Sequence, residues 1–476
     1  MVFNSIAFVV FLPIVVLLFY LLPHKWRWLM LLAASCVFYM WFVPKYILIL
    51  LVTIVIDYAA GLLMEHYADR PKLKKTFLII SIVSTLAVLM IFKYLGFITE
   101  NLDRLCALFG METHLVTHII LPIGLSFHTF QSMSYVIEVY RGHQKAERHF
   151  GYYSLYVMFF PQLVTGPIER PGNLLRQLHE KKEFRYENIS SGMRLILFGF
   201  FTKMVVADHL GTYVDEVYAH PAEYNSWSVM LASAFYTFQI YCDFFGYSTI
   251  ALGSAKLMGF DITDNFRTPY LSQSIAEYWQ RWHISLSTWF RDYVYIPMGG
   301  SRVKFWRWAF NIMVVFVLSG FWHGANWTFL IWGFSHGVLH IVEKALRRAL
   351  PTPGRASGTC PAVGKALLKA LRVAKTFLLV TLLFVMFRSS DLANMHDVYA
   401  AMFSNFGSGQ QLSITSSVWL YLALFVLFDV LLLNTRFDRW CEGKPLVLRW
   451  LIYAVLVFMV IACSSVNSFP FIYFQF

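Results

Sequence analysis

The sequence predicts an all-α polytopic membrane protein with about 11 transmembrane helices plus re-entrant or interfacial helices. Hydrophobic residues make up 58% of the 476-residue chain and charged residues only 14%, whereas ordinary soluble domains carry about 25% charged residues. The apolar residues lie in long continuous runs such as Ile6–Leu22 and Thr76–Phe92, while a membrane β-barrel would show short alternating strands. Lys and Arg are concentrated in alternate loops between these runs, which is typical of polytopic helical proteins.

The apolar runs define the predicted elements in chain order, because a span needs about 20 apolar residues. The segments are 5–22, 27–43, 46–64, 76–98, 118–140, 152–166, 191–210, 227–250, 308–322, 326–343, 376–388, 417–434 and 449–467. The first has no basic region before it and no cleavage motif after it, which favours a retained span over a signal peptide. Segments 152–166 and 376–388 are short for a span, and Phe159-Phe160-Pro161-Gln162 interrupts the former. We therefore expect at least one re-entrant or interfacial helix there, covered by protein or water.

The distribution of Lys and Arg predicts the orientation. Seven loops hold 29 of the 39 Lys and Arg residues: 23–28, 65–75, 141–149, 169–187, 298–307, 344–375 and 435–449. The intervening loops and the tail after 467 hold only Lys45, Lys93 and Arg104. The positive-inside rule places the basic loops in the cytoplasm and both termini outside it. The stretches 150–168 and 253–300, each flanked by loops on the same side, are expected to enter the membrane and return.

Net charge, cysteine pattern and loop length exclude several other classes. The net charge of +12 is explained by basic loops facing anionic membrane lipids rather than by a nucleic-acid partner. The six cysteines form no CxxC pair and no paired spacing, so neither a disulfide framework nor a zinc site is indicated. The longest loop, 344–375, contains Pro351, Pro353, Gly354 and Gly358 and is expected to be a cytoplasmic linker. The sequence thus predicts a single membrane domain over 1–476, with a catalytic core at about 118–343.

The stretch 270–300 combines ionisable and aromatic residues in a way that an ordinary span does not. Its members are Glu277, Trp279, Arg281, Trp282, His283, Ser287, Trp289, Phe290, Arg291 and Asp292. Ionisable groups inside a membrane protein are costly and usually face a cavity. Glu277 and Arg281 can pair at a spacing of four on a helix, and His283 and Ser287 have the same spacing. The alternative is an amphipathic helix lying in the lipid headgroup region.

A second candidate centre is the stretch 318–327, where His323 follows a long apolar run and is flanked by Gly320 and Gly324. Glycines allow close approach of another backbone or of a ligand. Burial against Trp322 is expected to keep this imidazole neutral, and a neutral imidazole can accept a proton from a hydroxyl as a general base. The alternative role is a histidine that satisfies helix-end carbonyls.

Other histidines are weaker candidates. His336 and His340 are four residues apart on a helix, a spacing that could bind a metal, but the Glu of a zincin motif and a third ligand are missing. Lining the helix bundle is the alternative role for this pair. His128 and Gln131 could line a cavity or simply pack in the core.

Several ordered motifs carry a resemblance to a known family. They are Asp264-Asn265-Phe266-Arg267-Thr268-Pro269-Tyr270, Trp279-Gln280-Arg281-Trp282-His283-Ile284-Ser285-Leu286-Ser287, Trp289-Phe290-Arg291-Asp292-Tyr293 and Gly320-Phe321-Trp322-His323-Gly324. Lesser matches are Phe159–Gln162, Gly166-Pro167-Ile168 and the aromatic tail 471–476. Over almost its whole length the chain resembles the membrane-bound O-acyltransferase (MBOAT) family, and in particular its bacterial alginate O-acetylase-like branch.

The resemblance implies a ring of tilted helices around a central tunnel in a bacterial inner membrane. It implies that His323 is the catalytic histidine and His283 the second histidine of the branch, with no metal and no tightly bound cofactor. The expected reaction moves an acetyl group from a cytoplasmic thioester, such as acetyl-CoA or an acyl carrier, to a cell-surface or exported polysaccharide. A separate periplasmic SGNH-type acyltransferase is the expected partner. Candidates for lining the tunnel are Trp282, Arg281, Ser287, Arg291, Asp292, Asn265, Trp322 and Asn326.

Three alternatives remain open from the sequence. The same fold could transfer D-alanine to teichoic acid. The chain could instead transport a glycan or lipid, because transporters also have many spans and polar groups in a cavity. An intramembrane metalloenzyme could use His323, His336 and His340 as ligands.

Overall fold

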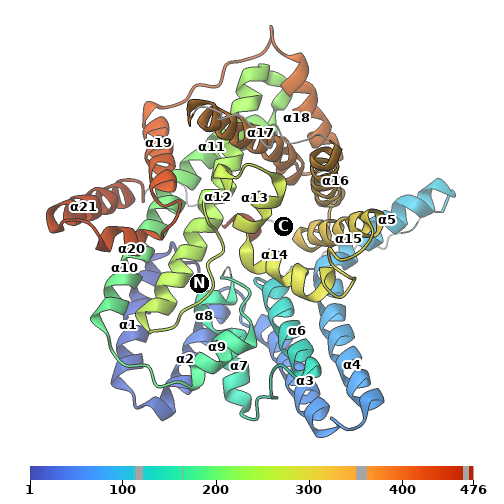
Figure 1. Cartoon of the computed structure of the whole chain (residues 1–476), viewed down its shortest axis with the longest axis vertical. Helices are drawn as coiled ribbons and strands as arrows, with labels where there is room; N and C mark the ends of the chain where they lie inside the picture. Colours follow the sequence, from blue (N-terminus) through green and yellow to red (C-terminus); the bar gives the residue numbers. More distant parts are fainter. Residues whose placement is uncertain are drawn as a thin grey trace. The chain divides into compact units, whose positions relative to one another are not determined.

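The computed structural model describes residues 1–476 except 112, 114–118, 120–121, 165, 350–361, 465–470 and 475–476. The described residues form helices and no β-strand, with one isolated parallel bridge between Tyr224 and Gln410 (Figure 1). The chain divides into two compact units. Unit 1 comprises Met1–Gly199 and Tyr247–Thr263, and unit 2 comprises Phe200–Gly246 and Asp264–Phe476. The single domain expected over 1–476 stays a prediction.

The first ten helices belong to unit 1. They are α1 (Ile6–Leu21), α2 (His24–Met40), α3 (Tyr46–His66), α4 (Pro71–Leu89), α5 (Leu95–Leu108), α6 (Leu125–Arg141), α7 (Phe150–Met158), α8 (Phe160–Leu163), α9 (Pro171–His179) and α10 (Tyr186–Phe200). A π-helical turn, η1 (Met90–Tyr94), joins α4 to α5. The predicted segment 118–140 begins among residues outside the described part of the chain, and its described helix is α6.

Unit 2 contains most of the remaining helices. They are η2 (Phe201–Ala207), α11 (Asp208–Ala219), η3 (Pro221–Glu223), α12 (Ser226–Leu257, whose last residues belong to unit 1), η4 (Pro269–Leu271), α13 (Ile275–Arg281), α14 (Ile284–Phe290), η5 (Arg291–Tyr295), α15 (Phe305–His323), α16 (Trp327–Ala349), α17 (Ala362–Arg388), α18 (Leu392–Ser404), α19 (Ser416–Leu431), α20 (Phe437–Glu442), α21 (Leu446–Ala462) and η6 (Ile472–Phe474).

The membrane class is confirmed in its coarse form. Within the described ranges, five helical stretches are long and apolar enough to cross a membrane: Tyr46–His66, Pro71–Leu108, Tyr186–Ala219, Phe305–His323 and Val363–Arg388. Ile6–Leu21, Ser416–Leu431 and Leu446–Ala462 are shorter apolar helices. The count of about 11 spans, the central tunnel and the location of the termini stay predictions.

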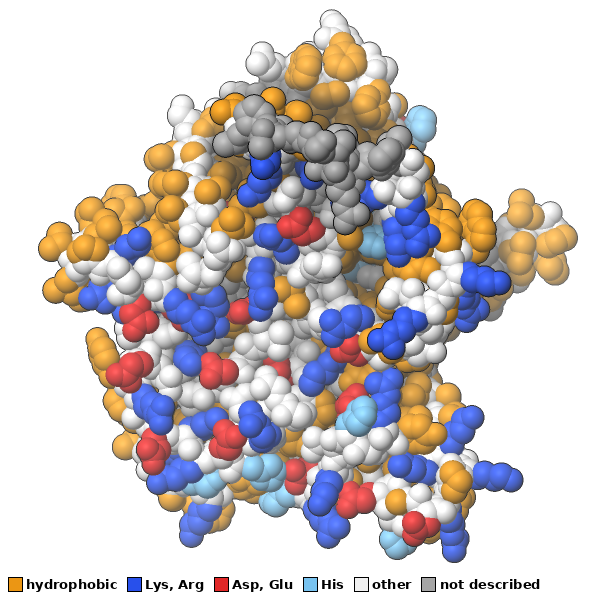
Figure 2. Space-filling model, viewed as in Figure 1, with side chains coloured by type: hydrophobic (Ala, Val, Ile, Leu, Met, Phe, Trp, Pro, Cys, Tyr) orange, Lys and Arg blue, Asp and Glu red, His pale blue; other side chains and the backbone are white. Residues whose placement is uncertain are grey.

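The apolar side chains on the surface fit this class. Helix α21 exposes Val447, Trp450, Leu451 and Phe458, each to more than half of its full area, and Figure 2 shows hydrophobic side chains gathered on this helix. A soluble protein rarely exposes such a continuous apolar patch. Contact with lipid explains it.

The short segment near 152 is interrupted as expected. Helix α7 ends at Met158 because Phe159 has a ψ of 109°, and Pro161 lies in the first turn of α8, where its missing N–H costs no hydrogen bond. All four residues of α8 are buried. The protein therefore covers the broken backbone, as a non-helical segment at membrane depth requires.

The segment near 376 differs from the expectation. It was predicted to be short, yet α17 has 27 residues and begins at Ala362. The residues before 376 are mainly Ala, Leu and Lys, which are strong helix formers, so the helix extends beyond the apolar run. The linker residues Pro351, Pro353, Gly354 and Gly358 lie outside the described residues.

Two glycines bring α15 and α16 into backbone contact. A Cβ at Gly320 would lie 2.3 Å from the carbonyl oxygen of Phe329, and one at Gly333 would lie 2.3 Å from that of Phe316. Small residues allow this close packing of helices in a membrane. The expectation of a close backbone approach at Gly320 is confirmed, and the contact fixes the end of α15 that carries His323.

Candidate active site

His323 is the last residue of α15. The helix stops there because Gly324 is extended, with φ −165° and ψ 155°. A Cβ at position 324 would lie 2.2 Å from the Phe329 ring, so only glycine fits beneath that ring. The His323 side chain is buried, with 3% of the residue exposed. Its ring centroid lies 5.1 Å from that of Trp332 and 5.2 Å from that of Phe387.

His283 lies at a break between two short helices, α13 and α14, which Figure 1 shows as separate elements. Its φ of 45° is in the left-handed region, and Thr268 is the other non-glycine residue with positive φ in the described chain. Such a backbone costs about 1–3 kcal/mol and is often retained at functional sites. The stretch 270–300 is therefore not one continuous amphipathic helix.

Asn265 holds the His283 turn in place. Its carbonyl oxygen accepts the Ile284 N–H at 3.0 Å, and its Oδ1 accepts the Ser285 hydroxyl at 2.6 Å. Both bonds lie at the first turn of α14 and compensate for the strained residue before it. Asn265, expected to line a tunnel, is fully buried and supports the turn that carries His283.

The structure brings the two predicted histidines together. The ring centroids of His283 and His323 are 6.5 Å apart, and the Trp322 ring lies 6.0 Å from His283. Aromatic rings surround them: Phe244 is 4.7 Å from His283, and Tyr473 is 5.7 Å from His323 and 6.5 Å from His283. The His283 side chain is 0% exposed, and a neutral imidazole can donate a hydrogen bond from one ring nitrogen while the other accepts.

The other predicted site residues have partners of their own. Arg281 pairs with Glu277 at 2.7 Å, as the spacing of four predicted, and donates to the Thr268 hydroxyl. Arg291 pairs with its neighbour Asp292 at 2.8 Å near the surface.

Three polar or aromatic candidates also pack against neighbours. Asn326 caps α16 by accepting the Thr328 N–H, and its side-chain amide donates to the Ser390 carbonyl oxygen. The Ser287 hydroxyl donates to the Trp282 carbonyl oxygen at 3.2 Å. The Trp282 ring is 2% exposed and stacks near Tyr278.

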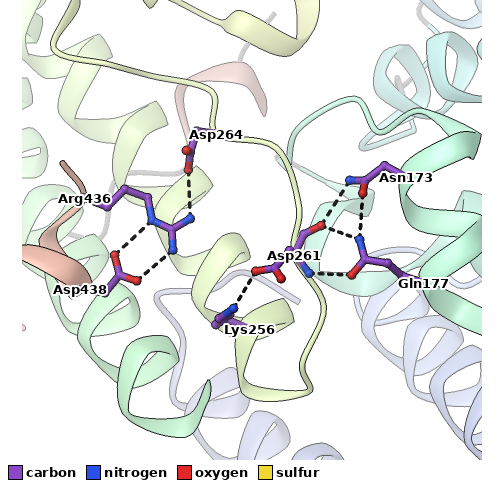
Figure 3. Close-up of polar contacts among 7 residues, drawn as sticks. All are labelled: Asn173, Gln177, Lys256, Asp261, Asp264, Arg436 and Asp438. Atoms are coloured by element: carbon purple, nitrogen blue, oxygen red, sulfur yellow. Dashed lines mark hydrogen bonds and ion pairs between the residues drawn. The ribbon is translucent and has the colours of Figure 1, made fainter. Parts of the chain in front are cut away.

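An ion pair anchors the first residue of the 264–270 motif. The Arg436 guanidinium makes two hydrogen bonds with the Asp438 carboxylate and contacts Asp264 at 3.5 Å (Figure 3). Burial alone would lower the pKa of Arg436, but the two carboxylates outweigh it and raise the pKa. Arg436 is therefore a permanent cation that holds the start of the segment leading to Asn265.

A separate set of contacts holds Asp261 in unit 1. Its carbonyl oxygen accepts from Gln177 at 2.7 Å and from Asn173 at 3.3 Å, and its carboxylate pairs with Lys256 at 2.7 Å (Figure 3).

Also in unit 1, His128 is buried and Gln131 donates to the Tyr156 carbonyl oxygen. These contacts match the packing role considered for both residues.

His336 and His340 contact aromatic side chains. His336 accepts a hydrogen bond from the Trp279 indole at 3.3 Å, and His340 lies between the Trp308 and Phe316 rings. Among the described residues, no three His, Cys, Asp or Glu side chains lie close enough to share an ion. The geometry gives no support to the set His323, His336 and His340.

Sequence reasoning did not assign a role to several residues of the site. Tyr473 belongs to the aromatic tail that was noted only as a motif, while Trp332 and Phe387 looked like ordinary apolar residues of spans. Lys203 and Asp243 are buried ionisable residues inside the apolar segments 191–210 and 227–250. Their position in those runs could have identified them as candidates, because charged residues within spans are usually functional.

Comparison with known proteins gives one family match and several named relatives. The model of the membrane-bound O-acyltransferase family matches residues 146–370. The protein named "Probable alginate O-acetylase AlgI" from Azotobacter vinelandii is 40% identical over 85% of this chain and 78% of its own. A Helicobacter pylori peptidoglycan O-acetyltransferase is 32% identical over 84% of this chain and 79% of its own. A Bacillus subtilis teichoic acid D-alanyltransferase is 30% identical over 46% of this chain and 57% of its own.

Proposed function

The chain belongs to the membrane-bound O-acyltransferase family and is a multi-pass membrane O-acyltransferase; on this premise we propose that it acetylates an exported polysaccharide. The donor is a cytoplasmic thioester, acetyl-CoA or an acyl carrier, and the protein works in the bacterial inner membrane. The alginate and peptidoglycan O-acetyltransferases among its relatives support an acetyl group and a glycan acceptor. The match to the D-alanyltransferase covers less of both chains, which favours acetyl over D-alanyl transfer.

The observation that carries the proposal is the pair of buried imidazoles. His323 and His283 come from segments forty residues apart in the sequence, yet their rings lie 6.5 Å apart inside a wall of aromatic side chains. An environment that excludes water strengthens hydrogen bonds to a developing charge. The left-handed backbone at His283 is strained, and such strain is often retained at functional sites.

In the proposed reaction His323 is the general base. It takes the proton from the acceptor hydroxyl, the hydroxyl oxygen forms a bond to the thioester carbonyl carbon, and a tetrahedral oxyanion results. Collapse of this intermediate breaks the carbon–sulfur bond, and the proton passes from His323 to the departing thiolate. His283 and the Trp322 indole are the candidates for donating hydrogen bonds to the oxyanion, which typically contributes several kcal/mol.

The basic residues of two loops are the proposed contact for the acyl donor. Loop 298–307 holds three Lys and Arg residues and no acidic one, while loop 169–187 holds five beside four Glu. Their cations would attract the phosphates of acetyl-CoA from the cytoplasmic side. We expect a separate SGNH-type acyltransferase to complete delivery to the polysaccharide. Membrane lipids surround the exposed apolar helices.

Incubation of membranes with acetyl-labelled acetyl-CoA tests this function. We expect label to appear in ester linkage on material outside the membrane, and only when the protein is present. Label that stays in the thioester while D-alanine from a charged carrier protein is transferred would overturn the choice of acyl group. Movement of a glycan or lipid without any acyl donor would support a transporter and contradict the enzyme proposal.

A further inference from the structure

Unit 2 contains a buried cluster of three charged residues. The Lys203 ammonium, in η2, lies 2.7 Å from a carboxylate oxygen of Asp208 and 2.6 Å from one of Asp243 on α12. The side chains are only 1%, 6% and 4% exposed. Lys203 and Asp208 lie on opposite sides of the end of a π-helical turn, a feature that often marks functional sites within helices.

The cluster also holds a segment from the far end of the sequence. The second carboxylate oxygen of Asp243 accepts the backbone N–H of Ile472 at 2.7 Å. Phe471 and Ile472 are buried, with 0% and 4% exposure. The segment 471–474 makes only one 3-10 turn, so it has no helix of its own to define its position.

This contact leads directly to the two histidines. The residue after Ile472 is Tyr473, whose ring lies 5.7 Å from His323 and 6.5 Å from His283. The residue after Asp243 is Phe244, whose ring lies 4.7 Å from His283 and 4.8 Å from Tyr473. Two neighbouring residues of α12 therefore hold the segment 471–474 and one wall of the histidine pair.

A buried ion cluster is a poor way to gain stability, because well-packed apolar residues do as well or better. A carboxylate nevertheless offers something that an apolar side chain cannot. It accepts a charge-assisted hydrogen bond from a backbone N–H, and such bonds are short and directional. Lys203 Nζ pairs with Asp243 Oδ1, which leaves Oδ2 to face the Ile472 N–H.

We propose that Asp243 is a positioning residue that fixes the segment 471–474 so that Tyr473 packs against His323 and His283. The proposal rests on the proposed function of the two histidines. Asp243 does not touch the reacting groups. It acts through the Ile472 backbone and the position of Tyr473, which forms part of the wall around the site.

Two uncharged triple variants isolate the hydrogen bond from the ion cluster. The first is Lys203→Met, Asp208→Asn and Asp243→Leu, which removes the acceptor for Ile472. The second has the same changes at positions 203 and 208 but Asp243→Asn, which keeps an acceptor oxygen. Neither variant leaves an unpaired buried charge, so neither should fail to fold for that reason. Asp208→Asn alone serves as a further control, because Asp208 does not contact the segment.

The first measurement is hydrogen–deuterium exchange of the 471–474 amides in the purified full chain. We expect roughly tenfold faster exchange at Ile472 in the Leu variant, the effect of one lost hydrogen bond, and near-parental exchange in the Asn variant. Equal exchange in the two variants would overturn the proposal. This readout needs no substrate, so it is independent of whether acetyl transfer is the correct reaction.

The second measurement is transfer from labelled acetyl-CoA by the same variants. We expect the Leu variant to lose at least about tenfold in rate, matching the lost hydrogen bond, and the Asn variant to restore most of it. A released segment with an unchanged rate would show that its position does not matter for the reaction and would overturn the proposal. If the parent protein fails to use acetyl-CoA, the proposed function fails while the exchange result still decides whether Asp243 holds the segment.

Discussion

Substitution of His323 by alanine is expected to abolish acyl transfer while the protein still inserts into the membrane and accumulates. A positioned general base typically contributes a hundredfold to ten-thousandfold, so we expect a loss of at least about a hundredfold. The imidazole lies at the end of α15, with its helix held by the close Gly320 contact. Its removal therefore leaves the backbone contact at Gly320 and Gly333 between α15 and α16 intact. Transfer from labelled acetyl-CoA, normalised to the amount of protein, measures the effect.

His336→Gln is the matched control for His323→Ala. His336 is as deeply buried and lies on the helix that packs against α15, but it contacts Trp279 rather than His283. Glutamine keeps a side-chain acceptor for the Trp279 indole. We expect this variant to keep most of its activity. Equal loss in both variants would favour the metalloenzyme alternative, and full activity of His323→Ala would remove the catalytic assignment.

Removal of the His283 imidazole is expected to lower transfer by as much as about a hundredfold, the effect of one lost oxyanion donor, and not by more than the loss at His323. The substitution must respect the backbone, because φ is 45° at this position. Asparagine and glycine tolerate the left-handed region better than alanine does. His283→Asn and His283→Gly therefore test the imidazole with the backbone strain relieved, whereas His283→Ala keeps the strain that the parent histidine bears.

The comparison among the three His283 variants separates chemistry from folding. If the imidazole itself acts, all three lose transfer to a similar extent, although the glycine and asparagine variants carry less backbone strain than the alanine variant. If His283 only packs, the glycine and asparagine variants retain the parental rate. That second outcome would leave His323 as the single catalytic imidazole of the site.

The sequence predicted those parts of the site that depend on local spacing. The Glu277–Arg281 pair and the interruption at Phe159–Gln162 follow from neighbours within one or two helical turns, and the close approach at Gly320 follows from the missing side chain there. The choice of His323 and His283 came from the family resemblance, and nothing in the spacing of the two residues brings them together. The 6.5 Å separation of their rings is a finding of the structure.

The rest of the site depends on long-range contacts that no local pattern encodes. The left-handed turn at His283 requires the Asn265 bonds from twenty residues earlier. The Lys203–Asp243–Ile472 contacts join three distant segments. The length of α17 differs from the prediction because the helix includes a lysine-containing stretch before its apolar part. Tyr473 lies in the aromatic tail, whose packing depends on these contacts; Gln475 and Phe476 of that tail lie outside the described residues.

The central claim is that His323 acts as the base on an acyl group delivered next to it. A structure of the membrane-embedded protein with a non-hydrolysable thioether analogue of acetyl-CoA tests this most directly. We expect the acetonyl carbonyl of the analogue to lie between the His323 and His283 rings, with space for one hydroxyl about 3 Å from a His323 ring nitrogen. An analogue whose acyl end binds away from both histidines, with His323 sealed from it by protein, would contradict the account.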